Sequence, residues 1–329
     1  MLEMFQALAP YFGGKRKLAK KIMRYAEGKR FIDAFMGGGS IALLAKAKGF
    51  QVAANDVAER SAIVGRALIE NDEVFIEEED VLRLFVPNAA NRHYVRDHKA
   101  NQFKAELCDF LDNARANIDE VNDPIKRAVM MLLWVRIIFY YRPMGTFTHI
   151  RAVEKIEDEQ ADTPILRSLQ ERYSQPLMAV VRDLAENINS GVFSNGLENE
   201  FHQKDVFEFL SQIEGDTVYL DPPYYGAQSY EYHYNVLDCM LAGKDLEPEH
   251  SVFSTKQVIG NTLKLFEASQ HIPTWVLSVG QRVIDKKRYI DLMSEFRKVE
   301  DIPISHAHTF GYGYNEEAGK QEVLLVGRS

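Results

Sequence analysis

Short apolar runs alternate with helix-like stretches over residues 1–70, and this pattern predicts strands and helices in turn. The run Phe31–Phe35 ends in glycines, which indicates a buried strand followed by a tight turn. The stretch Ser40–Lys48 is rich in Ala and Leu and is typical of a helix. A second strand and a second helix follow at Gln51–Asn55 and Val57–Ile69. Strands that alternate with helices predict a parallel sheet.

The alternation stops over residues 71–199, where the composition is mainly helical. The most apolar stretch, Val129–Tyr141, is too short to span a bilayer, which takes about 20 apolar residues. Arg136 also interrupts this stretch, so a buried helix is the better interpretation. We therefore expect residues 71–199 to form a mainly helical insertion.

The rhythm of strands and helices returns over residues 200–329. Thr217–Leu220 and Thr274–Val279 are apolar runs of strand length. Two more candidate strands follow at Ile302–Ile304 and Glu322–Val326. A Gly- and Asn-rich hairpin, Gly311–Asn315, lies between them. A sheet that begins, is interrupted and resumes predicts one α/β nucleotide-binding fold that carries an insertion.

The composition of the 329 residues is that of a globular protein, with 46% hydrophobic and 26% charged residues. Cys108 and Cys239 belong to no Cys-x-x-Cys pair, so we expect neither a disulfide framework nor a zinc site. Reduced cysteines and a start without a signal pattern favour the cytoplasm. His306 and His308 alternate on a candidate strand, but without a third ligand they predict no metal site.

The net charge of −9 argues against nucleic-acid binding over the whole surface. Residues 1–50 differ, because they hold ten Lys and Arg residues against three carboxylates, a local charge of +7. A basic face of this kind can meet phosphate groups while the acidic remainder keeps the chain soluble. A solvated helix face has the same charge pattern, so both interpretations stay open at this point.

Two features near the first two strands are typical of a nucleotide site. Gly37, Gly38 and Gly39 follow the first strand, where they let the backbone approach a ligand at the carboxyl end of the sheet. Asp56 ends the second strand, 17 residues after Gly39, and a carboxylate there can accept hydrogen bonds from ribose hydroxyls. The alternatives are a purely structural glycine turn and a helix N-cap at Asp56.

The most specific feature is Asp221-Pro222-Pro223-Tyr224, directly after the strand Thr217–Leu220. The prolines lack N–H groups and fix φ, so the corner is rigid and its carbonyl groups can point outward. One reaction that such a corner could serve is methylation of the N6 amine of adenine. That amine is a poor nucleophile, and two acceptors for its N–H groups favour the pyramidal geometry in which it attacks. The Asp221 carboxylate and the Pro222 carbonyl suit that task, and Tyr224 adds a stacking face. The alternative is a structural Asp-Pro-Pro turn.

Together these residues resemble the Dam-type DNA adenine methyltransferases over residues 10–70 and 200–329. That family has an N-terminal Gly-Gly-Lys segment near the methionine part of its cofactor, and the chain has Gly13-Gly14-Lys15. The family's catalytic tetrapeptide is intact here as Asp221 to Tyr224. The resemblance implies a cofactor-binding role for Tyr11, Gly14, Lys15, Asp33, Phe35, Gly37, Gly38, Gly39, Ser40, Asp56, Asp205, Val206 and Asp221.

The resemblance also implies a fold and an activity. The fold is a Rossmann-like class I methyltransferase sheet, mostly parallel with an antiparallel last strand. Residues 1–70 and 200–329 would bind S-adenosylmethionine and carry out catalysis, and residues 71–199 would recognise the target. The activity is site-specific methylation of a flipped-out adenine in double-stranded DNA, in the cytoplasm at the nucleoid, as in restriction-modification systems.

The segment Phe139–Phe147 departs from the family, because it keeps aromatic and arginine residues without the Asn-Gly and Arg pattern of the best-known members. The target sequence therefore does not carry over. We expect DNA contacts from Lys15, Arg16, Arg142, Tyr225 and Tyr230. Two alternatives keep the fold: methylation of an adenine in RNA or of a protein amide, and a catalytically silent DNA-binding protein.

Overall fold

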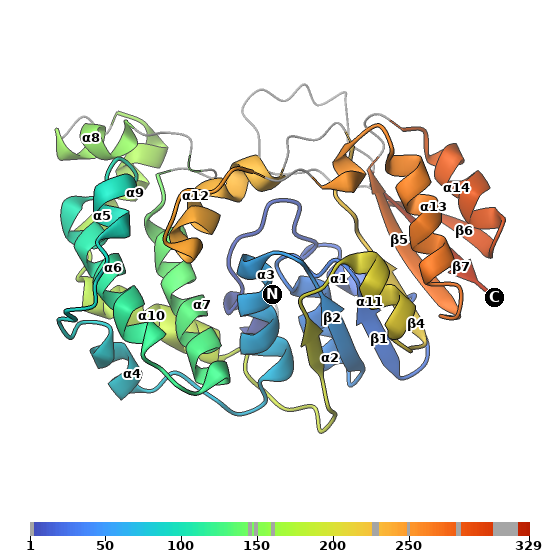
Figure 1. Cartoon of the computed structure of the whole chain (residues 1–329), viewed down its shortest axis with the longest axis horizontal. Helices are drawn as coiled ribbons and strands as arrows, with labels where there is room; N and C mark the ends of the chain where they lie inside the picture. The colour runs from blue at the N-terminus through green and yellow to red at the C-terminus, as the bar shows by residue number, and fades with distance from the viewer. Residues whose placement is uncertain are drawn as a thin grey trace. The chain divides into compact units, whose positions relative to one another are not determined.

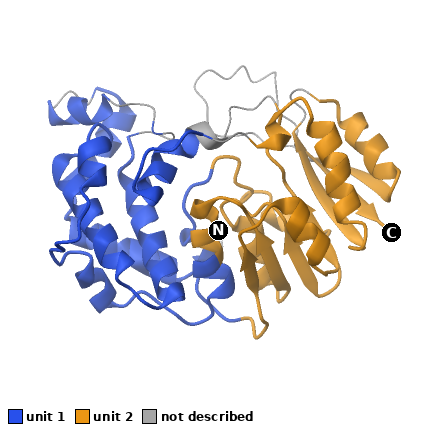
Figure 2. Ribbon diagram, viewed as in Figure 1, with its two compact units in different colours: residues 1–11, 66–194, 231–248 blue, residues 12–65, 195–230, 249–329 orange. Residues whose placement is uncertain are grey.

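The structure is a computed structural model, and it describes residues 3–143, 147, 151–158, 162–225, 230–248, 251–280, 284–304 and 322–329. The chain forms two compact units, drawn in blue and orange in Figure 2. Unit 1 comprises residues 1–11, 66–194 and 231–248, and unit 2 comprises residues 12–65, 195–230 and 249–329.

The strands of the described residues form one seven-stranded sheet in unit 2, in the order β3-β2-β1-β4-β5-β7-β6 (Figure 1). Their bounds are Arg30–Asp33 (β1), Gln51–Asn55 (β2), Glu200–His202 (β3), Thr217–Leu220 (β4), Thr274–Gly280 (β5), Lys298–Ile304 (β6) and Glu322–Arg328 (β7). From β3 to β5 all neighbours pair in parallel, whereas β7 is antiparallel to β5 and β6. This arrangement confirms the predicted Rossmann-like α/β class with an antiparallel last strand.

The register between β1 and β4 brings two candidate segments together. Asp33, the last residue of β1, lies opposite Tyr219 in β4. The pairing continues one residue further, because the Ala34 N–H donates to the Tyr219 carbonyl at 3.1 Å. The chain that follows each strand therefore leaves the sheet at the same carboxyl edge, where ligands bind in open α/β sheets.

Apolar helix faces pack on the sheet and form the core of unit 2. Its helices are Ala19–Ile22 (α1), Ser40–Ala47 (α2), Glu59–Val64 (α3), Val206–Gln212 (α11), the 3₁₀ turn Val252–Ser254 (η3), Val258–Ala268 (α13) and Lys286–Ser294 (α14). Leu210, Phe266 and Met293, from α11, α13 and α14, share one buried cluster with Trp275 of β5. Trp275 stacks on Phe266 with ring centroids 5.0 Å apart, and its Nε1 donates to the Ser269 carbonyl at 3.0 Å.

The main differences between the predicted strands and the structure lie at three places. Strand β6 begins at Lys298, four residues before the predicted start at Ile302. The run Phe31–Phe35 stops being a strand at Asp33, because the chain turns toward α2 and the Met36 N–H bonds to the Asn55 carbonyl at 2.9 Å. The edge strand β3 was not predicted from the sequence. It has three residues, of which Glu200 and His202 are polar, so it offers no apolar run or alternation.

The predicted helix Val57–Ile69 is two segments in the structure. The α-helix α3 ends at Val64, and residues Gly65–Glu70 continue as a π-helix (η2). Gly65 lies against the ring of Phe201, since a Cβ atom added there would lie 2.1 Å from a ring carbon. Any side chain at this position would collide with β3, which explains why glycine interrupts an otherwise regular helical pattern.

Unit 1 is helical in its described residues (Figure 1). Its helices are Glu3–Gln6 (η1, 3₁₀), Glu78–Arg83 (α4), Tyr94–His98 (α5), Ala105–Asp119 (α6), Pro124–Tyr141 (α7), Ala152–Glu157 (α8), Pro164–Ser174 (α9), Leu177–Asn189 (α10) and most of Tyr230–Ala242 (α12). The Asp123 side chain caps α7 by accepting from the Lys126 N–H at 2.8 Å, with Pro124 at the first position. Trp134 in α7 is fully buried, which confirms the buried helix predicted there.

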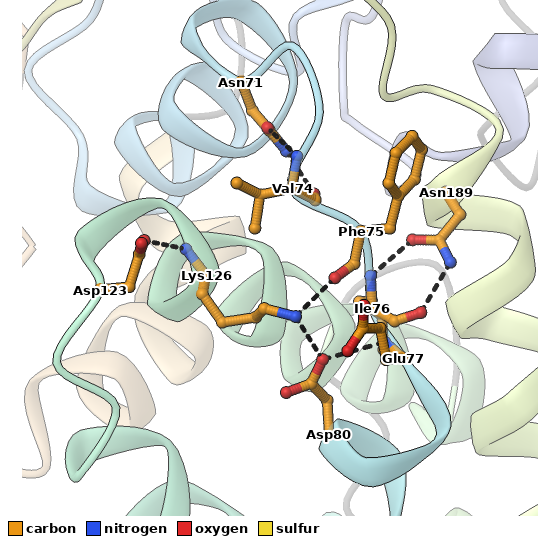
Figure 3. A network of polar contacts seen from close by, with 9 residues as sticks. All are labelled: Asn71, Val74, Phe75, Ile76, Glu77, Asp80, Asp123, Lys126 and Asn189. Carbon is orange, nitrogen blue, oxygen red and sulfur yellow. Dashed lines mark hydrogen bonds and ion pairs between the residues drawn. The ribbon is translucent and has the colours of Figure 1, made fainter.

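Side chains hold the non-helical segment before α4 in place (Figure 3). Asn189 pairs with both backbone groups of Ile76, accepting at 2.8 Å and donating at 2.9 Å. Lys126 donates to the Phe75 carbonyl at 2.7 Å and to Asp80 at 2.6 Å. Backbone groups that no helix or strand satisfies thus find side-chain partners. No helix among the described residues is long and apolar enough to cross a membrane.

Residues 231–248 belong to unit 1, although the predicted alternation of strands and helices over residues 200–329 groups them with the sheet. Within unit 1, the Tyr94 hydroxyl donates to Asp245 at 2.9 Å and Arg115 donates to the Leu241 carbonyl at 2.8 Å. The predicted hairpin Gly311–Asn315 and the residues His306 and His308 lie outside the described residues. The separate functional roles of the two parts of the chain stay predictions.

Candidate functional site

The glycine turn after β1 is tight and tied to the end of β2. Gly37 and Gly39 have φ values of 52° and 76°, a region that favours glycine. The Gly39 N–H donates to the Met36 carbonyl at 2.9 Å, and Gly39 is the N-cap of helix α2. Ser40, the first residue of α2, is buried. Because glycines carry no side chain, the backbone of this turn can be approached closely by a ligand.

Asp33 is a fully buried carboxylate under this turn. Its Oδ2 accepts from the Ala42 N–H at 3.1 Å, and its Oδ1 has no hydrogen-bond partner among the described residues. Burial, followed by the negative charge of Asp221, raises the pKa of the Asp33 carboxyl to about 8. A buried acceptor without a partner is costly in a folded chain and is consistent with a missing donor.

Asp56 links the glycine turn to the end of β2. Its Oδ2 accepts from the Gly37 N–H at 2.8 Å and its Oδ1 from the Ala58 N–H at 2.9 Å. The N-cap of α3 is Ala58, so Asp56 is not the helix cap that the sequence offered as an alternative. Each carboxylate oxygen has a second acceptor direction, which leaves Asp56 able to accept from hydroxyl groups.

Asp221 stands at the rigid corner after β4 with both oxygens engaged. Its Oδ2 lies 3.0 Å from Lys15 Nζ, and its Oδ1 accepts from the Tyr224 hydroxyl at 3.0 Å. The Lys15 side chain is 5% exposed and the Asp221 side chain 17% exposed, so the ion pair is largely desolvated. The corner thus holds the Asp221 carboxylate between the Lys15 ammonium and the Tyr224 hydroxyl, and the role of Asp221 toward a target amine stays a prediction.

The Gly-Gly-Lys segment folds so that Lys15 reaches this corner. Gly13 has a φ of 76°, and Lys15 Nζ donates to the Gly13 carbonyl at 3.1 Å. The same ammonium group lies 5.2 Å from the centroid of the Tyr224 ring, within cation–π range. Lys15 therefore contacts two residues of the predicted catalytic tetrapeptide, which is far removed from it in sequence.

Asp205 and Val206 are placed by an asparagine that was not predicted as a site residue. Asn55 is buried, and its amide accepts from the Lys204 N–H at 3.1 Å and donates to the Lys204 carbonyl at 3.2 Å. Asp205 is exposed and caps α11 by accepting from the Phe207 N–H at 2.9 Å. Val206 is buried in the core. The signal for Asn55 was a polar residue at the end of a buried strand.

Aromatic rings from three segments lie beside the turn. Phe35 packs edge-on against Phe253 with centroids 5.4 Å apart, and Phe207 lies 5.8 Å from Phe253. Phe35 and Phe207 are half-buried, whereas Phe253 is 2% exposed. Half-buried rings next to a glycine turn offer an apolar surface to a flat ligand, and Phe253 was not predicted from the sequence.

The residues predicted to contact DNA differ in their surroundings. Arg16 is half-buried, and burial lowers the pKa of its guanidinium. In unit 1, Arg142 lies 4.6 Å over the Phe139 ring, and burial lowers its pKa to about 10. Tyr225 is half-buried, and the side chain of Tyr230 lies outside the described residues.

Tyr11 is the last of the predicted cofactor-binding residues, and the sequence predicted no metal site. Tyr11 belongs to unit 1, where its ring stacks on Tyr234 with centroids 5.1 Å apart. Within the part of the chain that the structure describes, no group of three or more His, Cys, Asp or Glu residues has the arrangement of a metal site.

Three sequence similarities bear on this site. A model of the D12 class N6 adenine-specific DNA methyltransferase family matches residues 11–238. The chain is 30% identical over 323 residues to the type II methyltransferase M2.HphI of Haemophilus parahaemolyticus, which covers 96% of each chain. It is 24% identical over 254 residues to the type II methyltransferase M.NlaIII of Neisseria lactamica, which covers 73% of this chain and 71% of the relative.

Proposed function

The chain belongs to the D12 class of N6 adenine-specific DNA methyltransferases, and from that premise we propose that it transfers a methyl group from S-adenosylmethionine to the N6 amine of adenine in double-stranded DNA. The observation that carries the proposal is the geometry of Asp221. Its carboxylate is held by the Lys15 ammonium at 3.0 Å and the Tyr224 hydroxyl at 3.0 Å in a largely desolvated corner, at the edge of the sheet that also holds the glycine turn.

The residues around the glycine turn fit S-adenosylmethionine. The buried Asp33 Oδ1 lacks a donor among the described residues, and a cationic or N–H group would satisfy it. Asp56 can accept from ribose hydroxyls, and the half-buried rings of Phe35 and Phe207 suit a flat base. We assign the backbone of Gly37, Gly38 and Gly39, with Ser40 and Gly14, to the same cofactor. When bound, S-adenosylmethionine supplies an electrophilic methyl group on a sulfonium.

Asp221 and Pro222 act on the target amine. The N6 lone pair is delocalised into the adenine ring, so acceptors for both N–H groups help the nitrogen to pyramidalise and attack. As N6 gains the methyl group it becomes cationic, and the Asp221 carboxylate stabilises that charge until the proton leaves to water. The prolines keep the acceptors in place because neither can rotate about φ. Tyr224 provides a ring for stacking with the extruded base.

DNA recognition is assigned to the helical part of the chain, residues 71–199. Arg142 is the expected contact there, and Arg16, Lys15, Tyr225 and Tyr230 are the expected contacts on the catalytic side. Specific recognition of duplex DNA needs a large extra surface, which a helical insertion of this size supplies. Because both relatives are type II methyltransferases, we infer that this chain modifies one fixed DNA sequence, in the cytoplasm where chromosomal DNA lies.

The proposed activity is tested by labelled methyl transfer and by sequencing. The purified chain is incubated with S-adenosylmethionine labelled in its methyl group and with duplex DNA, RNA or protein acceptors. Methylation-aware sequencing of DNA from a host that expresses the chain then locates the modified base. We expect label in DNA alone and N6-methyladenine at one recurring sequence. Label in RNA with unlabelled DNA would refute the proposal.

The role of Asp221 has its own test. We expect Asp221→Ala to lower the turnover by on the order of 10²–10³-fold, the usual loss when one transition-state hydrogen-bonding group is removed. Cofactor affinity, measured by calorimetry, should remain near that of the wild type. Asp119→Ala is the matched control, since Asp119 is 52% exposed and pairs with Arg115 in α6. Near-normal turnover of the Asp221 variant would contradict the assigned role.

A further inference from the structure

Gly280 ends strand β5 beside the ring of Tyr224. A Cβ atom added at Gly280 would lie 2.6, 3.0 and 3.1 Å from three carbons of that ring. The φ of Gly280 is not positive, so its backbone conformation does not require glycine. The requirement is space, because the ring occupies the position where any side chain at residue 280 would begin.

The ring cannot give way without disturbing its other partners. Its hydroxyl donates to Asp221 at 3.0 Å, and the Lys15 ammonium lies 5.2 Å from its centroid. Two prolines precede it and restrict the backbone that carries it. Non-bonded carbons rest at about 3.5–4.0 Å, so an alanine at 280 would displace the nearest ring atom by roughly 1 Å.

We propose that Gly280 is a positioning residue for catalysis, whose bare backbone sets the plane of the Tyr224 ring and thereby the hydrogen bond from Tyr224 to Asp221. This inference rests on the proposed methyl transfer, in which Asp221 must reach the target amine and Tyr224 must stack on the base. Reactions between positioned groups are sensitive to such shifts, and a displacement of about 1 Å can cost on the order of 100-fold in rate.

Gly260 provides a matched control. It lies in α13, is exposed, and a Cβ atom added there would meet nothing within 4 Å. We expect Gly280→Ala to lower kcat roughly 10- to 100-fold while the calorimetric Kd for S-adenosylmethionine stays within about 2-fold of the wild type. Gly260→Ala should change neither. A Gly280→Ala variant with wild-type kcat overturns the proposal.

A double-mutant cycle separates an effect through the ring from a general effect on the sheet. In the Tyr224→Ala background the ring is absent, so adding Gly280→Ala should change single-turnover methyl transfer by less than about 2-fold. The same background should restore any loss of thermal stability caused by Gly280→Ala. If Gly280→Ala costs as much activity or stability without the ring as with it, the residue does not act through Tyr224 and the proposal fails.

A measurement on the protein alone tests the geometry apart from the activity. We would place 3-fluorotyrosine at position 224 and record its ¹⁹F spectrum. The resonance should move in Gly280→Ala and stay in place in Gly260→Ala. An inactive wild type would refute the proposed function while this shift still supported the contact. An active wild type whose ¹⁹F resonance ignores Gly280→Ala would refute the contact alone.

Discussion

At the scale of single residues, charge is distributed unevenly at the carboxyl ends of β1 and β4. Lys15 pairs with Asp221 at 3.0 Å, whereas Asp33 is fully buried and one of its oxygens lacks a partner among the described residues. Burial and the negative charge of Asp221 raise the pKa of Asp33 to about 8. We therefore expect the Asp33 carboxyl to be protonated at neutral pH in the free protein, and a cationic ligand would favour loss of that proton.

This pKa predicts how stability depends on pH. The folded chain binds a proton at Asp33 that the unfolded chain, with a pKa of about 3.9, releases. The contribution of this protonation to the free energy of unfolding is therefore complete below about pH 4. It is lost as the pH rises toward about 8, by up to about 1.4 kcal/mol per pH unit. Urea unfolding measures the free energy of unfolding at each pH in this range. That free energy should fall with pH in the wild type by this slope, and the fall should be absent in Asp33→Asn.

Asp216 supplies the control of opposite sign. Hydrogen bonds from the Arg30 and Lys29 N–H groups lower its pKa, so its contribution is present above about pH 4 and is lost only as the pH falls further. Asp216→Asn should leave the slope between pH 5 and 8 unchanged. Equal slopes for the wild type and Asp33→Asn in that window would contradict the protonated state of Asp33.

At the scale of elements, irregular segments depend on individual side chains more than helices do. The backbone of Ile76 is buried and belongs to neither a helix nor a strand, and Asn189 at the end of α10 satisfies both its N–H and its carbonyl group (Figure 3). Asn71 likewise accepts from the Val74 N–H at 2.8 Å and donates to the Val74 carbonyl at 2.7 Å. These amides replace the ladder that a strand would provide.

We expect Asn189→Ala to destabilise the chain, because it leaves two backbone groups of Ile76 without partners. Unsatisfied buried groups cost about 1–3 kcal/mol each, so a loss of that order should appear in chemical unfolding. Asn187 on the same helix is half-buried, and its side chain donates to the Asp183 carbonyl at 2.8 Å in an exposed hydrogen bond, so Asn187→Ala should cost far less. Equal losses for the two variants would show that the pairing of Asn189 with Ile76 contributes no more to stability than the hydrogen bond of Asn187.

At the scale of the whole molecule, a net charge of −9 coexists with a basic first segment. Lys17, Lys20 and Arg24 in and around α1 are exposed, whereas Lys15 is buried against Asp221. Exposed cations can approach phosphates, and each phosphate that they neutralise releases counterions and makes binding depend on salt. The sequence left a solvated helix face as the alternative, and the two interpretations predict different salt dependence.

If this segment meets DNA, replacing Lys17, Lys20 and Arg24 with Gln should weaken duplex binding across all sequences. The slope of log K against log salt should fall by about one for each phosphate that is no longer neutralised. A matched triple variant at the exposed residues Lys256, Lys264 and Lys287 controls for the change in net charge. Equal slopes for the two triple variants, measured by fluorescence anisotropy, would favour the solvated face.

Much of the fold and of the candidate site could be predicted before any tertiary contact was known. The bounds of β2 and β4, the buried helix α7 and the antiparallel last strand agree with the structure. The glycine turn and the Asp221 corner could be located because backbone preferences of Gly and Pro act within a few residues. The strand β3 and the π-helix after Val64 could not, because their causes lie in packing with distant residues.

The sequence by itself determined the alternation of strands and helices on both sides of a helical insertion, the rigid Asp-Pro-Pro-Tyr corner and the positions of Asp33 and Asp56 at strand ends, since these follow from local periodicity and local backbone freedom. Only the tertiary structure decided that Lys15 pairs with Asp221, that burial raises the pKa of Asp33, and that the Tyr224 ring fills the space beside Gly280. Those properties depend on distance and desolvation between segments that only the order of strands in the folded sheet brings together.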